Sequence, residues 1–206
     1  MIVKELQVGM IGTNCYVVAC PETQEAIVID PGDEAKRIHN LVTKNGFKIT
    51  AIVNTHGHWD HVGGNRELKK LTGAPIYIHE QDARFLTDGR LHLGSMMGNN
   101  ENSPAADKLL KEGDIVKVGK HNLKIIHTPG HTPGGISLIG ENLVFVGDTL
   151  FAGSIGRTDL PGGNYTTLIN SIKEKLLSLD DETVVYPGHG PSTTIGRERA
   201  RNPFLV

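Results

Sequence analysis

Three histidines and an aspartate fall within the short run His56-Gly-His-Trp-Asp-His61, directly after the apolar stretch Ile49–Val53. These side chains are common metal ligands, and the composition of the chain gives this spacing a chance likelihood of only about one in a thousand. A metal held in this way can activate water for hydrolysis. The run therefore predicts a metal site that includes His56, His58, Asp60 and His61.

Three further candidate ligands follow predicted strands elsewhere in the chain, each beside small, turn-forming residues. They are His131 in Thr128-Pro-Gly-His-Thr-Pro-Gly-Gly135, Asp148 after Gly147, and His189 in Pro187-Gly-His-Gly-Pro191. Glycine and proline turns let the backbone bend sharply and approach a metal closely. We expect all seven side chains to meet at one edge of the sheets.

Seven nitrogen and oxygen ligands are too many for one four-coordinate structural zinc. They suit two divalent metals about 3.5–4 Å apart that keep open positions for water and substrate. Such a pair would acidify a water between them enough to supply hydroxide, and would stabilise the oxyanion formed when a carbonyl is attacked. Zinc is the expected metal, and iron and manganese also suit these ligands.

The elements that must position these residues read as two similar strand-rich halves of a single domain, about 1–107 and 108–206. The sequence predicts strands at 4–8, 14–19, 25–29, 49–53, 75–78, 115–118, 123–127, 136–139, 143–146 and 183–186. It predicts helices from Asp33 as cap to Gly46, then at 63–71, 80–86, 165–179 after the cap Asn164, and around 196–201. The predicted fold is α/β, an αββα four-layer sandwich.

The segment 87–107 lacks periodicity and could be a mobile lid or a plain surface insertion, with His92, Met96 and Met97 at a pocket mouth in the first case. Cys15 and Cys20 lie five apart on one predicted strand, so they face opposite ways and should remain reduced thiols. Asp30 either orients a ligand histidine or simply caps a turn.

A net charge of -2 in 206 residues, with scattered Lys and Arg, indicates neither a nucleic-acid nor a membrane partner. The N-terminus lacks the apolar centre of a signal peptide, and no stretch of about 18 apolar residues occurs. We therefore expect a cytoplasmic, soluble protein that is a monomer or a homodimer.

The combined motifs closely resemble the metallo-β-lactamase superfamily, and more narrowly its small, single-domain glyoxalase II-like hydrolases. The matching segments are Asn14-Cys-Tyr16, Asp30-Pro-Gly32, Thr55 to His61, Thr128 to Gly135, Gly147 to Phe151, Gly156 to Asp159 and Pro187-Gly-His189. The resemblance implies that His56, His58 and His131 bind one metal and that Asp60, His61 and His189 bind a second. It implies that Asp148 bridges both ions and that Asp60 also orients the attacking hydroxide.

The same resemblance implies a small-molecule thioester substrate, such as the glutathione thioester S-lactoylglutathione. Glyoxalase II enzymes carry an additional C-terminal helical domain that binds glutathione, and we expect none here because the sequence ends at Val206. Arg157 keeps an anion-binding character and is the predicted substrate-binding residue. Arg197 and Arg199 are weaker candidates, since a solvated helix face explains them better.

Other activities remain open at this stage. Persulfide dioxygenases of the same fold use one iron, whose ligands would here be His56, His131 and Asp148. A β-lactamase is disfavoured because the zinc β-lactamases with a similar motif have cysteine in place of Asp148. A nuclease would need added basic segments, and a non-catalytic binding module would be expected to lack a ligand.

Overall fold

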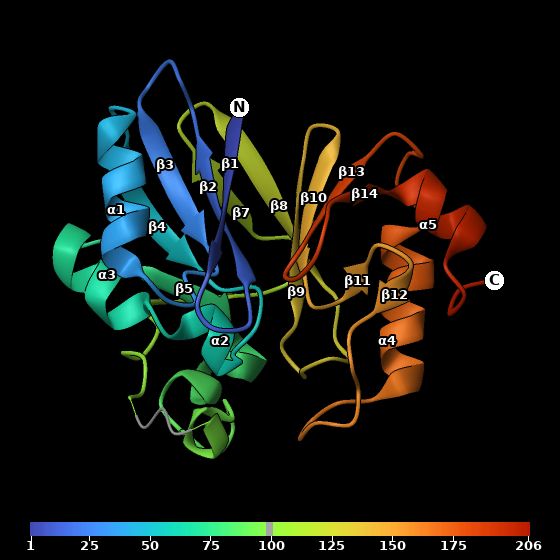
Figure 1. Ribbon diagram of the computed structural model, residues 1–206. Coiled ribbons are helices and arrows are strands. Elements are labelled where there is room, and N and C mark those ends of the chain that lie inside the picture. The colour runs from blue at the N-terminus through green and yellow to red at the C-terminus, as the bar shows by residue number, and fades with distance from the viewer. Residues whose placement is uncertain (98–100) are drawn as a thin grey trace.

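The computed structural model describes residues 1–97 and 101–206, and its framework is a pair of six-stranded sheets (Figure 1). The first sheet has the order β1 (Ile2–Val8), β2 (Thr13–Ala19), β3 (Glu25–Ile29), β4 (Lys48–Val53), β5 (Ile76–His79) and β6 (Lys108–Leu110). The second has the order β14 (Thr193–Thr194), β13 (Val184–Pro187), β10 (Leu143–Gly147), β9 (Ile136–Gly140), β8 (His121–His127) and β7 (Ile115–Val118). A small hairpin, β11 (Leu150–Phe151) and β12 (Ser154–Ile155), stands apart.

Helices cover the outer face of each sheet (Figure 1). The first sheet carries α1 (Ala35–Lys44) and α3 (Asn65–Thr72), and the second carries α4 (Tyr165–Ser171) with its π-helical extension η3 (Ile172–Leu176) and α5 (Ile195–Arg201). The predicted αββα four-layer sandwich is confirmed. The short helical turns α2 (Trp59–Val62), η1 (Glu80–Leu86) and η2 (Gly94–Met97) belong to the connections of the first half.

Strand β2 shows how the sequence builds these layers. All seven of its residues are buried, and alternate side chains enter different cores, because successive side chains of a strand point to opposite faces. Cys15 and Val17 pack under the helices, whereas Tyr16 and Val18 pack between the sheets. Cys20, just after the strand, also packs between the sheets, so the two cysteines face opposite ways as their spacing predicts.

Strands β3, β4, β5 and β6 are parallel, as are β10 and β13. Parallel strands bring their carboxyl ends, and the loops that follow, to one edge of a sheet, where α/β proteins commonly bind ligands. The segments after β3, β4, β10 and β13 carry Asp30, the histidine run, Asp148 and His189. The topology thereby gathers chemistry that is dispersed along the chain.

Three details differ from the prediction. Helix α1 begins after Glu34, whose backbone is left-handed. The Asp33 carboxylate accepts from the adjacent N–H of Glu34 and not from an N–H of the helix, so Asp33 is not the helix cap. The histidine run is not wholly a loop, because α2 includes Asp60 and His61. Strand β6 belongs to the first sheet, so the chain passes to the second sheet slightly later than the predicted boundary at about residue 107.

Strands β6, β11, β12 and β14 were not predicted, and each has only two or three residues, too few for periodicity to register. Among the described residues, no helix combines the length and the apolar character needed to cross a bilayer.

Candidate metal centre

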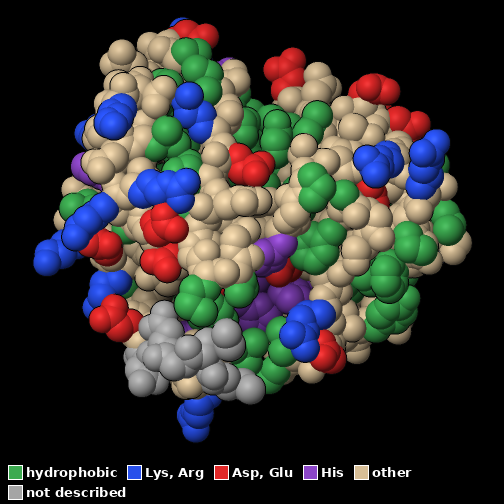
Figure 2. Space-filling view, in the orientation of Figure 1, with side chains coloured by type: hydrophobic (Ala, Val, Ile, Leu, Met, Phe, Trp, Pro, Cys, Tyr) green, Lys and Arg blue, Asp and Glu red, His purple; other side chains and the backbone are tan. Residues whose placement is uncertain are grey.

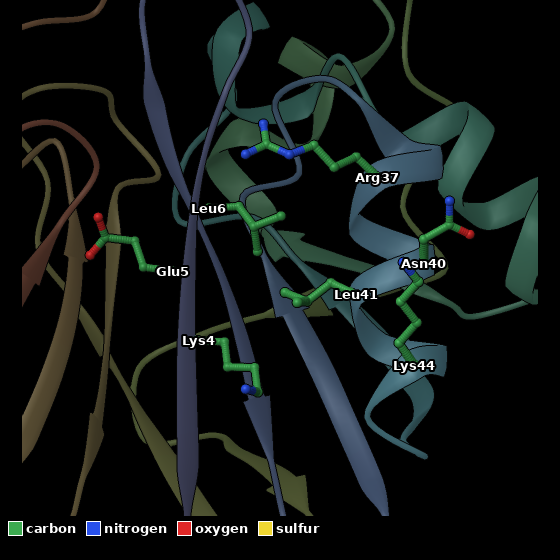
Figure 3. A pocket seen from close by; sticks show the side chains of 7 residues that line it. All are labelled: Lys4, Glu5, Leu6, Arg37, Asn40, Leu41 and Lys44. Carbon is green, nitrogen blue, oxygen red and sulfur yellow. The ribbon is translucent and has the colours of Figure 1, made fainter.

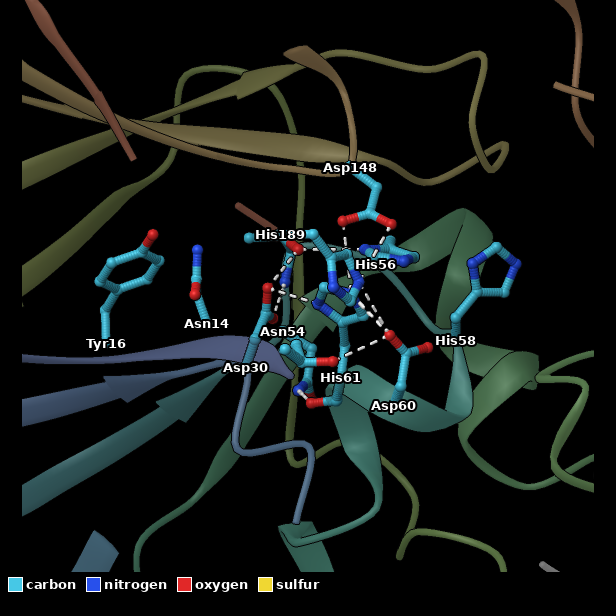
Figure 4. Close-up of polar contacts among 12 residues, drawn as sticks. Asn14, Tyr16, Asp30, Asn54, His56, His58, Asp60, His61, Asp148 and His189 are labelled. Carbon is cyan, nitrogen blue, oxygen red and sulfur yellow. Dashed lines mark hydrogen bonds and ion pairs between the residues drawn. The ribbon is translucent and has the colours of Figure 1, made fainter. Parts of the chain in front are cut away.

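The seven predicted metal ligands lie together where the two sheets meet, and we call them the His–Asp cluster (Figure 4). His56 and His58 follow β4, Asp60 and His61 lie on α2, and His131, Asp148 and His189 follow β8, β10 and β13. Histidine side chains are visible at the bottom of a hollow between the two halves of the sandwich (Figure 2). Both sheets contribute to the cluster.

One group within the cluster consists of His56, His58 and His131, all buried. Nδ1 of His58 lies 2.9 Å from Nε2 of His131, and the ring of His56 lies 4.8 Å from each of the other two rings. Thr55 Oγ1 lies 3.1 Å from Nδ1 of His56, which directs Nε2 toward the group. Three imidazoles in this arrangement can coordinate one metal ion.

A second group consists of Asp60, His61 and His189. Oδ2 of Asp60 lies 3.2 Å from Nε2 of His61 and 3.1 Å from Nε2 of His189. The hydroxyl of Thr13 donates to the same Oδ2 at 3.0 Å and fixes its orientation. Two imidazoles and a carboxylate in this arrangement can coordinate a second metal ion.

Asp148 stands between the two groups. Its Oδ1 lies 3.4 Å from Nε2 of His61, and its Oδ2 lies 3.6 Å from the Nε2 atoms of both His131 and His189. One carboxylate thus reaches a member of each group, which is the position a bridging ligand needs.

Four buried atoms of this cluster have no hydrogen-bond partner among the described residues: Nε2 of His56, His58 and His61, and Oδ1 of Asp148. A buried polar atom without a partner costs about 1–3 kcal/mol, so four in one place are unfavourable unless they bind something. Because all four are typical metal-ligand atoms, the donor set fits divalent cations.

The protonation states agree with this fit. Burial, and next the neighbouring His131, lower the pKa of His58 to about 3, and burial holds the pKa of His56 well below its ordinary value. Burial raises the pKa of Asp148, but the charge of His61 outweighs it and leaves the pKa below normal. Neutral imidazoles and ionised carboxylates are the forms that bind metals.

His61 differs, because its carboxylate neighbours outweigh its burial and raise its pKa well above normal. One of them, Asp30, has its Oδ2 3.0 Å from Nδ1 of His61 and also accepts from the N–H and the hydroxyl of Thr55. Of the two roles left open for Asp30, its contacts support the orientation of a ligand histidine.

Gly188 allows the last ligand loop to approach the others. A Cβ at this position would fall 2.2 Å from Oδ1 of Asp148 and 2.7 Å from Cε1 of His61, so no side chain fits. The same loop is held by β2, since Asn14 Nδ2 and Tyr16 Oη both donate to the carbonyl of Pro187, at 3.0 and 2.7 Å (Figure 4 labels both residues).

Asp82 is a positioning residue that the sequence did not reveal. It lies on η1, is fully buried, and joins the loops of the first ligand group. Its Oδ2 accepts from the N–H of Gly57 at 3.0 Å and from the hydroxyl of Thr132 at 2.7 Å, while Oδ1 accepts from the N–H of Gly134 at 2.6 Å. Neither periodicity nor a local motif marks this residue, because its partners lie far away in sequence.

We expect Asp82→Asn to destabilise the protein by about 2 kcal/mol, since an amide cannot accept all three hydrogen bonds and leaves a buried donor unsatisfied. Loss of this support should weaken metal binding by about 10- to 100-fold. Thermal unfolding and metal titration measure both effects. Asp88→Asn, whose exchanged carboxylate accepts from the nearby Arg90, is the matched control. Unchanged metal affinity in Asp82→Asn would contradict the positioning role.

A pocket of about 630 Å³ opens beside the His–Asp cluster, and its walls are largely apolar. Apart from cluster members, its lining is Ile11, Trp59, Leu93, Phe151, Ser154, Ile155, Arg157 and Leu160. The predicted substrate-binding residue Arg157 therefore lies at the pocket, with its exposed guanidinium paired to Asp159 at 2.7 and 2.8 Å. Its carbonyl accepts from Nδ1 of His131 at 2.7 Å and so orients that ligand.

Arg197 and Arg199 lie on α5 and are not in the pocket lining; Arg199 instead donates to the carbonyl of Leu179 and pairs with Asp181. Within 87–107, Leu93 reaches the pocket while His92 is buried, accepting from the N–H of Trp59 through its carbonyl. The side chains of Met96 and Met97, and residues 98–100, lie outside the described residues. The lid and the plain insertion thus remain alternative predictions.

The remaining histidines stay outside the His–Asp cluster. His79 and His127 stack with ring centroids 4.2 Å apart, and burial, with His127 next, lowers the pKa of His79 to about 4.

Another hollow, of about 730 Å³, lies between β1 and α1 (Figure 3). Its lining offers Lys4, Arg37 and Lys44 but no histidine or cysteine, and Glu5 points away from α1, so it is not a metal site.

Comparison with known proteins gives a consistent picture. The family model described as metallo-beta-lactamase superfamily matches residues 8–189. An uncharacterised protein of Aquifex aeolicus is 46% identical, over 99% of this chain and 97% of its own length. The hydroxyacylglutathione hydrolase GloC of Haemophilus influenzae is 39% identical, over 100% of this chain and 98% of its own.

Solved structures share the fold closely. BLEG-1, described as a B3 metallo-beta-lactamase, superposes with a TM-score of 0.94 at 37% identity and covers 100% of both chains. TTHA1623 in a di-iron-bound form gives 0.89 at 38% identity, over 98% of this chain and 100% of that one. ETHE1 from Myxococcus xanthus superposes with a TM-score of 0.82 at 31% identity, over 98% of this chain and 84% of that one.

Proposed function

Because the chain belongs to the metallo-beta-lactamase superfamily, whose members are generally hydrolytic metalloenzymes that bind divalent metals, we propose that it is a dinuclear hydrolase of glutathione thioesters such as S-lactoylglutathione. The observation that carries this proposal is the division of the ligands into two groups of three with Asp148 between them. The likeness to GloC supports the substrate class.

In the proposed site, His56, His58 and His131 would hold one ion and Asp60, His61 and His189 the other, and Asp148 would serve both. When bound, two divalent ions, most simply zinc, would acidify water to hydroxide near neutral pH and polarise the substrate carbonyl. The likeness to TTHA1623 in a di-iron-bound form makes iron another metal to test.

The residues of the chain would do the remaining work. The carboxylate of Asp60, fixed by the hydroxyl of Thr13, can accept a hydrogen bond from the attacking water and orient it. Asp30 and the carbonyl of Arg157 keep the rings of His61 and His131 in place. The pocket walls exclude bulk water from the thioester. The leaving thiolate needs little or no proton, so the mechanism assigns no general acid.

The test is an assay of S-lactoylglutathione hydrolysis set against oxygen consumption with glutathione persulfide, on the same preparation. Thioester hydrolysis without oxygen uptake supports the proposal. Oxygen uptake with a single iron at His56, His131 and Asp148 would instead establish the alternative, a mononuclear iron persulfide dioxygenase. Failure to cleave any thioester, with intact metals, would remove the substrate class but not the metal centre.

Arg157 gives a sharper test of substrate binding. We expect Arg157→Ala to raise KM for an anionic thioester by about tenfold, with little change in kcat, because one exposed charge-assisted contact is lost. Asp159→Asn is the matched variant: it releases the guanidinium from its carboxylate partner and should lower KM. Steady-state kinetics measure both, and unchanged KM in Arg157→Ala would take Arg157 out of the binding site.

A further inference from the structure

A second set of metal-ligand side chains lies at the end of the sandwich opposite the His–Asp cluster. Cys20, Glu22 and His121 place their ligand atoms within 4.8 Å of one another. Strand β2 begins at Thr13, which contacts Asp60, and ends just before Cys20, so this set is a full strand length away from the proposed catalytic centre. We call it the Cys–His set.

The three residues come from both sheets. Cys20 and Glu22 belong to the turn between β2 and β3 of the first sheet, and His121 begins β8 of the second. Both turns lie at the end of the molecule away from α2 (Figure 1). A ligand held by this set would therefore connect the two sheets.

Two observations point to a ligand here. His121 has a ring nitrogen within 4.8 Å of a thiol and a carboxylate, and its Nε2 is buried and has no hydrogen-bond partner among the described residues. The thiol of Cys20 is fully buried and donates to Oε2 of Glu22 at 3.0 Å. A sulfur, an imidazole nitrogen and a carboxylate oxygen are together a typical ligand set for zinc.

The sulfur of Cys20 lies against the turn between β7 and β8. Glu22 raises the pKa of Cys20, but hydrogen bonds from the backbone of Lys120 and from Thr23 outweigh it and leave the pKa below its usual value. Gly119 makes this approach possible, because a Cβ there would fall 2.8 Å from Sγ of Cys20. The turn therefore brings backbone rather than a side chain against the sulfur.

We propose that Cys20, Glu22 and His121 form a third metal site, separate from the catalytic centre, that binds Zn²⁺ or a similar divalent cation. Binding forms the metal–sulfur bond and releases the thiol proton to solvent, with no change of oxidation state. Solvent reaches the set through exposed Glu22 and a hollow of about 370 Å³ lined by His121 and Glu141. A water completes a tetrahedral site, whose function is to join the two sheets.

Cobalt(II) gives a selective test, because the His–Asp cluster contains no thiol. The full-length protein, stripped of metal by a chelator that is then removed, is titrated with Co²⁺ and followed by near-ultraviolet absorption. We expect a thiolate-to-cobalt charge-transfer band in the wild type and in Cys15→Ser, and none in Cys20→Ser. Absence of the band from the wild type, or its persistence in Cys20→Ser, overturns the proposal.

Glu22→Gln and His121→Gln provide variants in case Cys20→Ser does not fold. Glu22 is exposed, so its replacement leaves the core intact. In each variant the apparent affinity for Co²⁺, read from the charge-transfer band, should fall by at least about tenfold. A Co²⁺ affinity equal to that of the wild type in both variants would overturn the ligand assignment. Thioester hydrolysis should be retained in Glu22→Gln. Because the cobalt band does not depend on hydrolysis, a failure of the proposed function leaves this test unaffected.

Discussion

Replacing Asp148 by alanine will abolish hydrolysis, with kcat/KM falling at least about a thousandfold while the fold persists. The reason is geometric. Asp148 is the residue whose two carboxylate oxygens lie within 3.4–3.6 Å of His61, His131 and His189, and so reach both ligand groups. In the proposed dinuclear site its loss would remove the contact shared by the two ions, and metal content should fall along with activity.

Steady-state kinetics and elemental analysis of Asp148→Ala measure these effects. Asp180→Ala, at an exposed position in the turn after η3, is the control and should behave as the wild type. Circular dichroism separates loss of the centre from loss of the fold. Full activity with wild-type metal content in Asp148→Ala would refute the bridging role.

Removal of the metals will cost most of the stability as well as all of the activity. An ion bound at a free concentration about 1,000 times its Kd stabilises the native state by about 4 kcal/mol, so two ions contribute about 8 kcal/mol. For a chain of this size the melting temperature should fall by at least about 15 °C. The buried atoms without partners in the cluster are the structural basis of this dependence.

The measurement is differential scanning calorimetry of protein dialysed against a chelator, beside protein dialysed without it. Added Zn²⁺ should restore both the melting temperature and hydrolysis. A metal-free sample, verified by elemental analysis, that melts and turns over like the control would show that the cluster is held by protein contacts alone.

The sequence predicted the site residues more fully than it predicted their supports. The seven candidate ligands are local signals, since five stand beside a glycine just after a strand, and Asp60 and His61 belong to the same histidine run. Asp82 is different: its partners at Gly57, Thr132 and Gly134 become neighbours only when both sheets are assembled. Asn14 and Tyr16 support the His189 loop for the same reason, over a sequence separation of more than 170 residues.

The fold divides in a similar way. Longer strands such as β2 and β8 were found from their β-branched and apolar residues, whereas strands of two or three residues depend on their partners in the sheet. The start of α1 was misplaced because the chain enters the helix through Glu34 in a left-handed conformation, which composition does not reveal. Sequence therefore predicts the elements that bury apolar faces, and tertiary contacts set their ends.

The number of metal ions in the active protein tests the central claim most directly. It is best counted in the Cys20→Ser variant, which removes the proposed third site, with hydrolysis of S-lactoylglutathione measured as the metal is added. We expect activity to rise until two ions are bound per chain and then to remain constant. Full hydrolysis at one ion per chain, or one iron with oxygen uptake on glutathione persulfide, would contradict the dinuclear account.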